Sequence, residues 1–159
     1  MFEHKTIVGS LEEKYQSLHK QLDALLSGEK DQIANLSNAS ALLNQFLTDV
    51  NWVGFYLWKN GELVLGPFQG LPACVNIPYG KGVCGTAVKE KKTIRVDNVH
   101  DFSGHIACDA ATNSEIVVPL MKDGHFIGVL DIDSPLKSRF SKEDQEGLEH
   151  FVKTLLVHL

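Results

Sequence analysis

Three cysteines are the residues of this 159-residue chain best suited to redox chemistry. Cys74, Cys84 and Cys108 are its only cysteines. Cys84 follows Gly80-Lys81-Gly82-Val83 near the predicted start of a short helix, where the helix dipole favours a thiolate. Cys108 is predicted in a polar loop and is followed at once by Asp109, which is unusual for a buried thiol. An odd number of cysteines argues against a framework of permanent disulfides. Incidental thiols, metal ligands and redox groups are the alternatives.

Two aspartates end a predicted strand with the sequence Gly128-Val129-Leu130-Asp131-Ile132-Asp133. Strand alternation places Asp131 and Asp133 on one face and leaves the apolar residues between them for the core. Neighbouring carboxylates repel each other unless a cation lies beside them, and the ammonium group of a free amino acid is such a cation. Turn formation at Ser134-Pro135 is the alternative interpretation. Glu115 adds a third acid at the start of the preceding predicted strand.

The first predicted strand presents two different faces. One face is suited to the core and the other carries aromatic rings with polar atoms around a glycine; the two sets are Val53, Phe55, Leu57 and Trp52, Gly54, Tyr56, Trp58. We predict that Trp52 and Tyr56 form a wall for a small apolar ligand group such as a thioether, which packs well against aromatic rings. Simple aromatic packing beneath a loop is the alternative.

No metal site or cofactor is predicted. The chain lacks a Cys-x-x-Cys pair, and His100, His105 and Cys108 do not have the spacing of familiar zinc ligands. It also lacks the Gly-x-Ser-x-Gly motif of serine hydrolases and the Walker pattern of phosphate-binding loops. Thiol chemistry on a small ligand is therefore the favoured hypothesis.

Helices are predicted at both ends of the chain. Residues 1–48 contain one helix after the capping-box sequence that runs from Ser10 to Glu13, and a second that begins near Asp31. Residues 141–157 form a C-terminal helix with Ser141 as its N-cap. The apolar residues expected to supply the buried faces include Tyr15, Leu18, Leu22, Leu25, Leu26, Ile33, Leu36, Leu42, Leu43, Phe46, Phe151, Leu155 and Val157.

Residues 51–133 are predicted to form a sheet and the loops of the site. Asn60-Gly61 and Asp123-Gly124 are hairpin signals. The remaining predicted elements are short strands at 75–77 and 93–96, a short helix at 83–90 and a polar loop at 97–113. This order predicts an α+β fold in which helices cover one face of a central antiparallel sheet and loops build the site on the other. We expect residues 1–159 to form a single domain.

Composition and charge narrow the possible partners. Hydrophobic residues make up 43% of the chain and charged residues 22%, as in ordinary globular proteins. A net charge of −5 without a basic stripe argues against nucleic acid or an anionic membrane as a partner. The N-terminus lacks the apolar stretch of a secretory signal, and apolar runs such as Ile116 to Met121 are too short to span a bilayer. We expect a cytoplasmic protein, where cysteines are kept reduced, and the apolar N-terminal helices make a homodimer plausible.

Four segments of the chain together resemble the free methionine-R-sulfoxide reductases, which are built on a GAF domain. GAF domains in general share the Gly-Lys-Gly and Gly-Val-Leu patterns, but the combination with Cys74, Cys84 and Cys108 is specific. The resemblance extends over nearly the whole chain. The segments are Asn51-Trp52-Val53-Gly54-Phe55-Tyr56, Gly80-Lys81-Gly82-Val83-Cys84-Gly85, Val96-Asp97-Asn98-Val99-His100 and Gly128-Val129-Leu130-Asp131-Ile132-Asp133-Ser134.

The resemblance implies reduction of free methionine-R-sulfoxide to methionine by a thiol. It makes Cys108 the nucleophile, which becomes a sulfenic acid. Cys74 then resolves the sulfenic acid as a disulfide, which an external dithiol, thioredoxin, reduces. Cys84 is a possible second relay or, as the less favoured alternative, the attacking thiol.

The same resemblance gives the polar and aromatic residues their expected roles. Glu115, Asp131 or Asp133 donates the proton that the sulfoxide oxygen requires, and the others hold the ammonium group. Trp52 and Tyr56 enclose the methyl end of the substrate. The alternative function is a non-catalytic GAF module that binds a small ligand or senses redox state. A purely structural domain would leave the paired acids and clustered cysteines without a role.

Overall fold

The computed structural model describes residues 2–159, so Met1 of the predicted domain lies outside the described residues. Four α-helices, one 3-10 helix and six strands alternate along this part of the chain. In order they are α1 (Leu11–Leu26), α2 (Gln32–Phe46), β1 (Trp52–Lys59), β2 (Glu62–Gly70), β3 (Asn76–Pro78), α3 (Gly82–Glu90), β4 (Ile94–Val96), η1 (Val99–Asp101), β5 (Ser114–Lys122), β6 (His125–Ser134) and α4 (Lys142–Leu156).

The six strands form one antiparallel sheet in the order β3-β2-β1-β6-β5-β4. Both predicted hairpins are confirmed. Asn60 and Asp123 adopt left-handed backbone angles with φ of 52° each, and the glycine after each also has positive φ. This is the turn chemistry that the twist of paired strands favours. Strands β1 and β6, which carry the predicted site residues, therefore lie side by side at the centre of the sheet.

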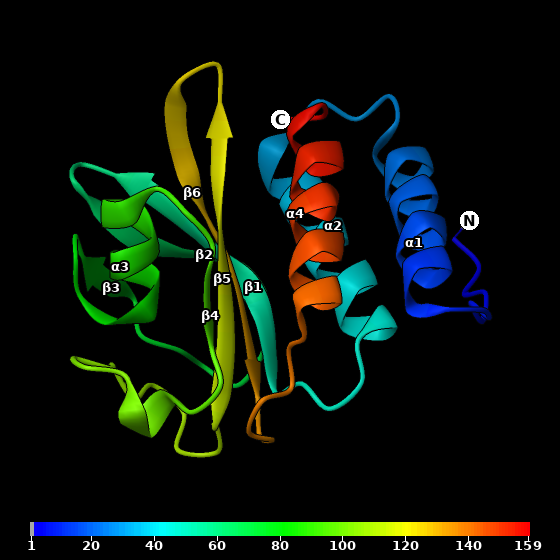
Figure 1. Cartoon of the computed structure of the whole chain (residues 1–159). Helices are drawn as coiled ribbons and strands as arrows, with labels where there is room; N and C mark the ends of the chain where they lie inside the picture. The colour runs from blue at the N-terminus through cyan, green and yellow to red at the C-terminus, as the bar shows by residue number, and fades with distance from the viewer. Residues whose placement is uncertain (1) are drawn as a thin grey trace.

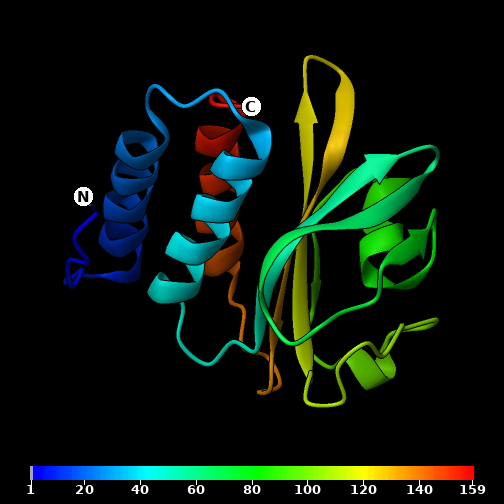
Figure 2. The same cartoon turned by 180° about the vertical axis from the view of Figure 1, so that it is seen from behind.

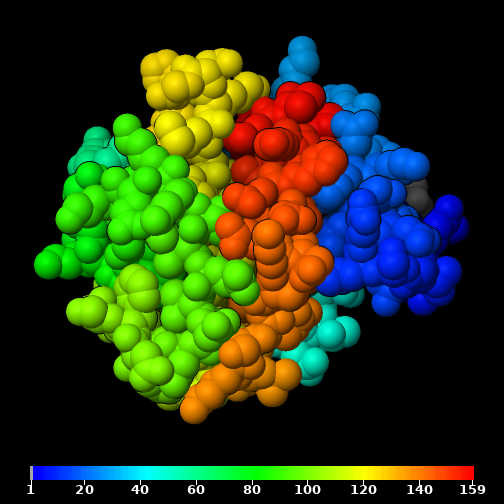
Figure 3. Space-filling view, viewed as in Figure 1, coloured from blue at the N-terminus to red at the C-terminus, as the bar shows by residue number. Residues whose placement is uncertain are grey.

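One face of the sheet is covered by α2 and α4, and α1 packs against these two helices as an outer layer (Figure 1, Figure 2). The predicted division of β1 into two faces is confirmed, because the residues of its aliphatic face are at most 5% exposed within this core. Leu130 and Ile132 of β6 are fully buried beside them. The space-filling view shows α4 between α1 and the segments of the opposite face (Figure 3).

The caps that begin the helices follow the prediction. The side chains of Ser10, Asp31 and Ser141 each accept a hydrogen bond from a backbone N–H of the first helical turn. At α4 the bond is reciprocal, because the Asp144 carboxylate accepts from the Ser141 N–H. Asp144 also accepts from the Tyr15 hydroxyl at 2.7 Å, so this cap ties α1 to α4.

The predicted α+β fold with a central antiparallel sheet is confirmed, and the short helix predicted at 83–90 lies among the loops of the site. Helix α3 lies on the opposite face of the sheet, together with the loop that follows β4 (Figure 1). The physical reason is that this face is also largely apolar. Val117 and Val129 are fully buried, and they pack in a second cluster with Val83 and Ala87 of α3. The site is thus built between the sheet and a second, smaller hydrophobic layer.

Two residues predicted to be buried are exposed instead. Ile33 is 52% exposed, because Asn35 takes the inner position at this end of α2 and donates to two backbone carbonyls. Val157 is 73% exposed, because it follows the end of α4. Strand β2 extends to Gly70 across a register shift at Gly66-Pro67. No helix among the described residues is both long and apolar enough to cross a membrane.

Candidate active site

A cavity on the α3 face of the sheet brings the predicted site residues together. Seven of the eight line it, namely Trp52, Tyr56, Cys84, Cys108, Glu115, Asp131 and Asp133. Cys74 is the eighth, and it joins them through its disulfide bond to Cys108. Residues that are distant in sequence meet here because β1, β6 and β5 are neighbours in the sheet, with Trp52 opposite Asp133 and Asp133 opposite Glu115.

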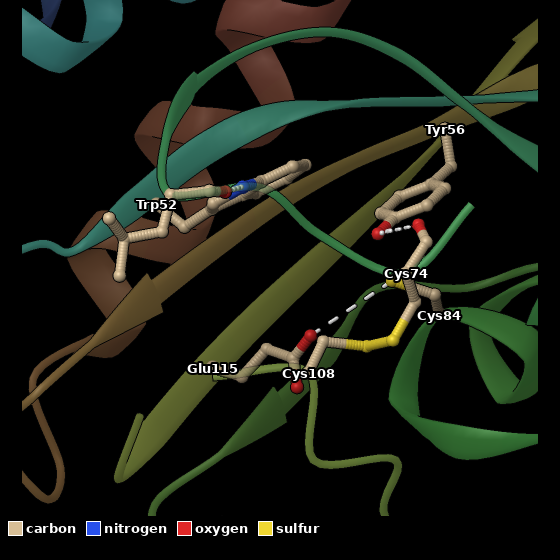
Figure 4. The surroundings of a disulfide bond; sticks show 7 residues. Trp52, Tyr56, Cys74, Cys84, Cys108 and Glu115 are labelled. Carbon is tan, nitrogen blue, oxygen red and sulfur yellow. Dashed lines mark hydrogen bonds between the residues drawn. A yellow bond between two sulfur atoms is a disulfide. The ribbon is translucent and has the colours of Figure 1, made fainter. Parts of the chain in front are cut away.

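Two stacked aromatic rings form one wall of the cavity. The ring centroids of Trp52 and Tyr56 are 5.7 Å apart with an interplanar angle of 25°, and both side chains are buried. Trp52 Nε1 donates to the Leu71 carbonyl at 3.2 Å, and the Tyr56 hydroxyl donates to the Cys74 carbonyl at 2.9 Å. The rings therefore line the cavity and also hold the segment that carries Cys74 (Figure 4).

Phe68 belongs to the same aromatic group and was not predicted. Its ring stacks on Trp52 at 5.1 Å with an interplanar angle of 16°. Alternation from Leu63 and Leu65 would place Phe68 on the other face of the sheet, and the register shift in β2 between Leu65 and Phe68 brings it to this one. A Cβ at Gly54 would lie 2.3 Å from the Phe68 Cβ, so glycine at this position lets the two rings pack across β1.

Cys74 and Cys108 form a disulfide with their Cα atoms 5.7 Å apart (Figure 4). The bond joins the segment before β3 to the loop between η1 and β5. Cys108 is exposed and Cys74 is partly exposed, so solvent reaches both sides of the bond. These are the two cysteines that the family resemblance pairs as nucleophile and resolving thiol.

Cys84 is buried and free, and its surroundings oppose the thiolate that the helix dipole favours. Burial raises the pKa of its thiol well above the ordinary value, and Asp131, Glu115 and Asp133 raise it further by charge repulsion. The Sγ atom donates to Glu115 Oε2 at 4.0 Å. The dipole of a nine-residue helix is equivalent to roughly half a charge at its N-terminus, and here desolvation with three nearby acids outweighs it.

Three carboxyl groups, those of Glu115, Asp131 and Asp133, line the cavity. Glu115 and Asp131 are 6% and 5% exposed, and Asp133 is partly exposed. Burial raises the pKa of all three carboxyls, and for Glu115 and Asp133 the neighbouring Asp131 raises it further. Asp131 Oδ1 and Asp133 Oδ1 accept no hydrogen bond from the residues that the structure describes. A cationic or hydrogen-bond-donating ligand would satisfy both atoms.

Asn51 links the Cys108 loop to the acid-bearing strands and was not predicted as a site residue. Its Nδ2 donates to Asp109 Oδ2 at 3.0 Å and to Thr112 Oγ1 at 3.1 Å. Its backbone N–H donates to the Asp133 carbonyl at 2.9 Å. An asparagine just before a strand has no sequence signature of such a role. Its place in the first motif of the resemblance was the only signal.

Two other features of the cavity bear on its chemistry. His105 lines it, and burial, followed by the charge of His100, lowers the pKa of its imidazole. Cys84, Glu115 and Asp131 each bring one potential metal-ligand atom to within 4.8 Å of the others. The arrangement thus combines an exposed redox pair, an aromatic wall and a desolvated cluster of proton-holding groups.

Comparison with known proteins agrees with this geometry. Residues 33–159 match the GAF domain family. The chain is 57% identical to Protein YtsP of Bacillus subtilis, covering 98% of this chain and 96% of that protein. It is 55% identical to the free methionine-R-sulfoxide reductase of Escherichia coli, covering 90% of this chain and 87% of the enzyme.

The fold of this chain is also similar, over nearly its whole length, to that of a solved structure. The free methionine-R-sulfoxide reductase of Neisseria meningitidis in complex with its substrate superposes with a TM-score of 0.94 at 39% identity, covering 99% of this chain and 95% of that one. Both the sequence and the fold are similar to those of free methionine-R-sulfoxide reductases over at least 90% of this chain. The chain belongs to the free methionine-R-sulfoxide reductase family of GAF-domain proteins.

Proposed function

We propose that this protein reduces free methionine-R-sulfoxide to methionine, with Cys108 as the nucleophile. The observation that carries the proposal is the position of Cys108, which shares one cavity with the aromatic pair and the three acids. The Escherichia coli relative is named for this activity, and the Neisseria meningitidis relative is described in complex with its substrate. No external cofactor enters the proposed reaction.

The substrate would bind by its two chemically different ends. Its ammonium group would lie among Glu115, Asp131 and Asp133, where it supplies donors to the two free Oδ1 atoms and makes ionisation of the acids less costly. Its methyl and thioether end would pack against Trp52 and Tyr56. Its carboxylate would meet backbone N–H groups of the loop at 97–113. This arrangement selects a free amino acid, because a peptide lacks the free ammonium group.

The chemical step transfers the sulfoxide oxygen to the enzyme. The Cys108 thiolate attacks the sulfoxide sulfur, and the oxygen takes a proton from Glu115, Asp131 or Asp133. Methionine leaves and Cys108 becomes a sulfenic acid. A carboxyl whose pKa is raised keeps its proton closer to neutral pH and can donate it here, which is the property required of a general acid.

Recovery of the enzyme would follow in two steps. The Cys74 thiol condenses with the Cys108 sulfenic acid, which forms the disulfide and releases water. An external dithiol, thioredoxin, then reduces the disulfide by exchange and is itself oxidised. The exposure of Cys108 supports access by such a partner. Cys84 is less suited to attack because its thiol is buried and its pKa is raised.

The remaining expectations concern the setting of the protein. A cytoplasmic location and a homodimer formed through the N-terminal helices stay predictions. Helix α1 forms the outer layer and carries Leu11 at 40% exposure, which is compatible with such a contact.

The alternative function is a ligand-binding or redox-sensing module, which would use the same cavity and disulfide without turnover. The proposed enzyme and the alternative module differ in whether methionine is formed as a product.

Turnover with each epimer tests the proposed function. With dithiothreitol as reductant, the purified protein is expected to convert free methionine-R-sulfoxide to methionine and to leave the S epimer and peptide-bound R-sulfoxide largely unchanged. Chromatographic quantification of methionine measures this. Binding of the R epimer without product would instead favour the sensing module.

Replacing each cysteine of the disulfide separates attack from resolution. Cys108→Ser is expected to abolish methionine release even in a single turnover, because the nucleophile is gone. Cys74→Ser is expected to release about one methionine per enzyme in the first turnover and then to recycle poorly with thioredoxin. Rapid-quench measurement of methionine distinguishes the two. Full activity of Cys108→Ser would remove the proposed nucleophile.

Neutralising one acid tests ammonium binding. Asp133→Asn is expected to raise KM by roughly tenfold or more, because a hydrogen bond to a charged group contributes about 1.5–3 kcal/mol. Steady-state kinetics measure the change. Asp123→Asn makes the same substitution in an exposed hairpin turn and serves as the matched control, with kinetics expected to stay as in the parent protein. An unaltered KM in Asp133→Asn would contradict the assignment.

Removing the Asn51 amide tests positioning of the Cys108 loop. Asn51→Ala loses two hydrogen bonds of roughly 0.5–1.5 kcal/mol each, so the rate of the first turnover is expected to fall about tenfold while KM changes little. Asn51→Asp should be at least as slow, because it places a second carboxylate against Asp109. Asn38→Ala, on the exposed side of α2, is the control. A change confined to thermal stability would reduce Asn51 to a structural role.

A further inference from the structure

Cys84 is a buried thiol that the proposed reaction does not need. Cys74 and Cys108 already form the disulfide, which leaves Cys84 as the free thiol of the described chain. Two carboxyl groups lie beside it. Glu115 Oε2 lies 4.0 Å from Sγ (Figure 4). Cys84, Glu115 and Asp131 each bring one potential ligand atom to within 4.8 Å of the others.

The spacing of the Cys84 and Glu115 ligand atoms is close to that of two ligands in a metal site. In tetrahedral zinc sites the Zn–S distance is about 2.3 Å and the Zn–O distance about 2.0 Å, which places sulfur and oxygen ligands about 3.5 Å apart. The Sγ–Oε2 distance of 4.0 Å exceeds that value by about half an ångström. Side-chain rotation alone can supply such a contraction. The backbone positions are fixed by helix α3 and by the neighbouring strands β5 and β6.

The charge balance also favours a cation. Asp131 is 5% exposed, yet its Oδ1 accepts no hydrogen bond from the described residues. None of the ion pairs formed by the residues at 2–159 includes Glu115, Asp131 or Asp133. Buried oxygen and sulfur ligands without a cationic partner are the composition of a divalent cation site.

We propose that Cys84, Glu115 and Asp131 form a binding site for a thiophilic divalent cation such as Zn²⁺, and that this cation excludes the substrate. The thiol selects zinc-like metals over Mg²⁺ and Ca²⁺, which prefer all-oxygen coordination. Binding displaces the thiol proton and any proton on the two carboxyls, so the site releases protons as the metal enters. The metal is an inhibitor here and not a cofactor. Its competition with substrate rests on the proposed function, whereas its binding does not.

No ligand spacing along the chain indicated this site. The three ligands are separated by 31 and 16 positions along the chain, and the familiar zinc spacings place pairs of ligands within a few residues. The expectation that the chain holds no metal rested on those spacings. The ligands converge only because α3 crosses the face of the sheet that carries the acids.

Cobalt binding to the oxidised protein tests the site directly. With the Cys74–Cys108 bond formed, a thiolate-to-cobalt charge-transfer band can come only from Cys84. We expect one equivalent of Co²⁺ to produce this band and the visible absorption of tetrahedral cobalt, and Zn²⁺ to abolish both. Cys84→Ser is expected to lose the charge-transfer band, and Glu115→Gln to weaken binding roughly tenfold or more. No such band in the parent protein, or its persistence in Cys84→Ser, would overturn the proposal.

Two controls separate this result from the proposed function. His150→Ala removes an imidazole on the distant α4 surface and should leave the band unchanged; its loss there would assign the cobalt to surface histidines and refute the site. Added methionine-R-sulfoxide is expected to displace Co²⁺, and calorimetry of the metal-free oxidised protein measures substrate binding alone. Substrate that binds without displacing Co²⁺ would refute exclusion. Absence of substrate binding would count against the proposed function and leave the metal site standing.

Discussion

The desolvation of carboxyl groups at one end of the central strands is the constraint on which the rest of the site depends. Strand alternation sends Leu130 and Ile132 into the main core, so Asp131 and Asp133 must face the other side, where α3 and the following loop exclude much of the water. Unpaired buried carboxylates are costly. Burial raises the pKa values of these three groups, and no lysine or arginine of the described residues forms an ion pair with them. The cluster is therefore poised either to hold protons or to accept a cation from outside.

The same constraint gives the cysteines different chemistry. Cys84 is buried beside Glu115 and Asp131, where desolvation and negative charge raise the pKa of its thiol despite its place in the first turn of α3. Cys108 lies on a loop and is exposed. Because the reactivity of a thiol follows the stability of its thiolate, the raised pKa of Cys84 and the exposure of Cys108 support the proposed choice of Cys108 as nucleophile. The effect of a helix dipole falls off within one turn, whereas burial disfavours the charged form of the whole thiol group.

Local sequence rules predicted the parts of the structure that depend on neighbouring residues. The hairpins at Asn60-Gly61 and Asp123-Gly124 and the shared face of Trp52 and Asp131 follow from turn chemistry and strand alternation. What depends on distant partners was missed. Phe68 was hidden by a register shift, Asn51 acts through a loop some 60 residues away, and the environment of Cys84 exists only once α3 lies on the sheet. The pairing of Cys74 with Cys108 came from the family resemblance and not from their spacing.

Two kinds of tether hold the loop that carries Cys108, and only one of them is permanent. The disulfide attaches the loop to Cys74, whose carbonyl is held by the Tyr56 hydroxyl, and so connects it to the aromatic wall. Asn51 attaches the same loop to the end of β6 through Asp109 and Thr112. Reduction breaks the first connection and leaves the second. In the reduced state, which the proposed reaction requires, the loop is therefore held at the acid end and released at the aromatic end. The hydrogen bonds of Asn51 do not depend on the disulfide, so they keep the loop in register with the acid-bearing end of β6.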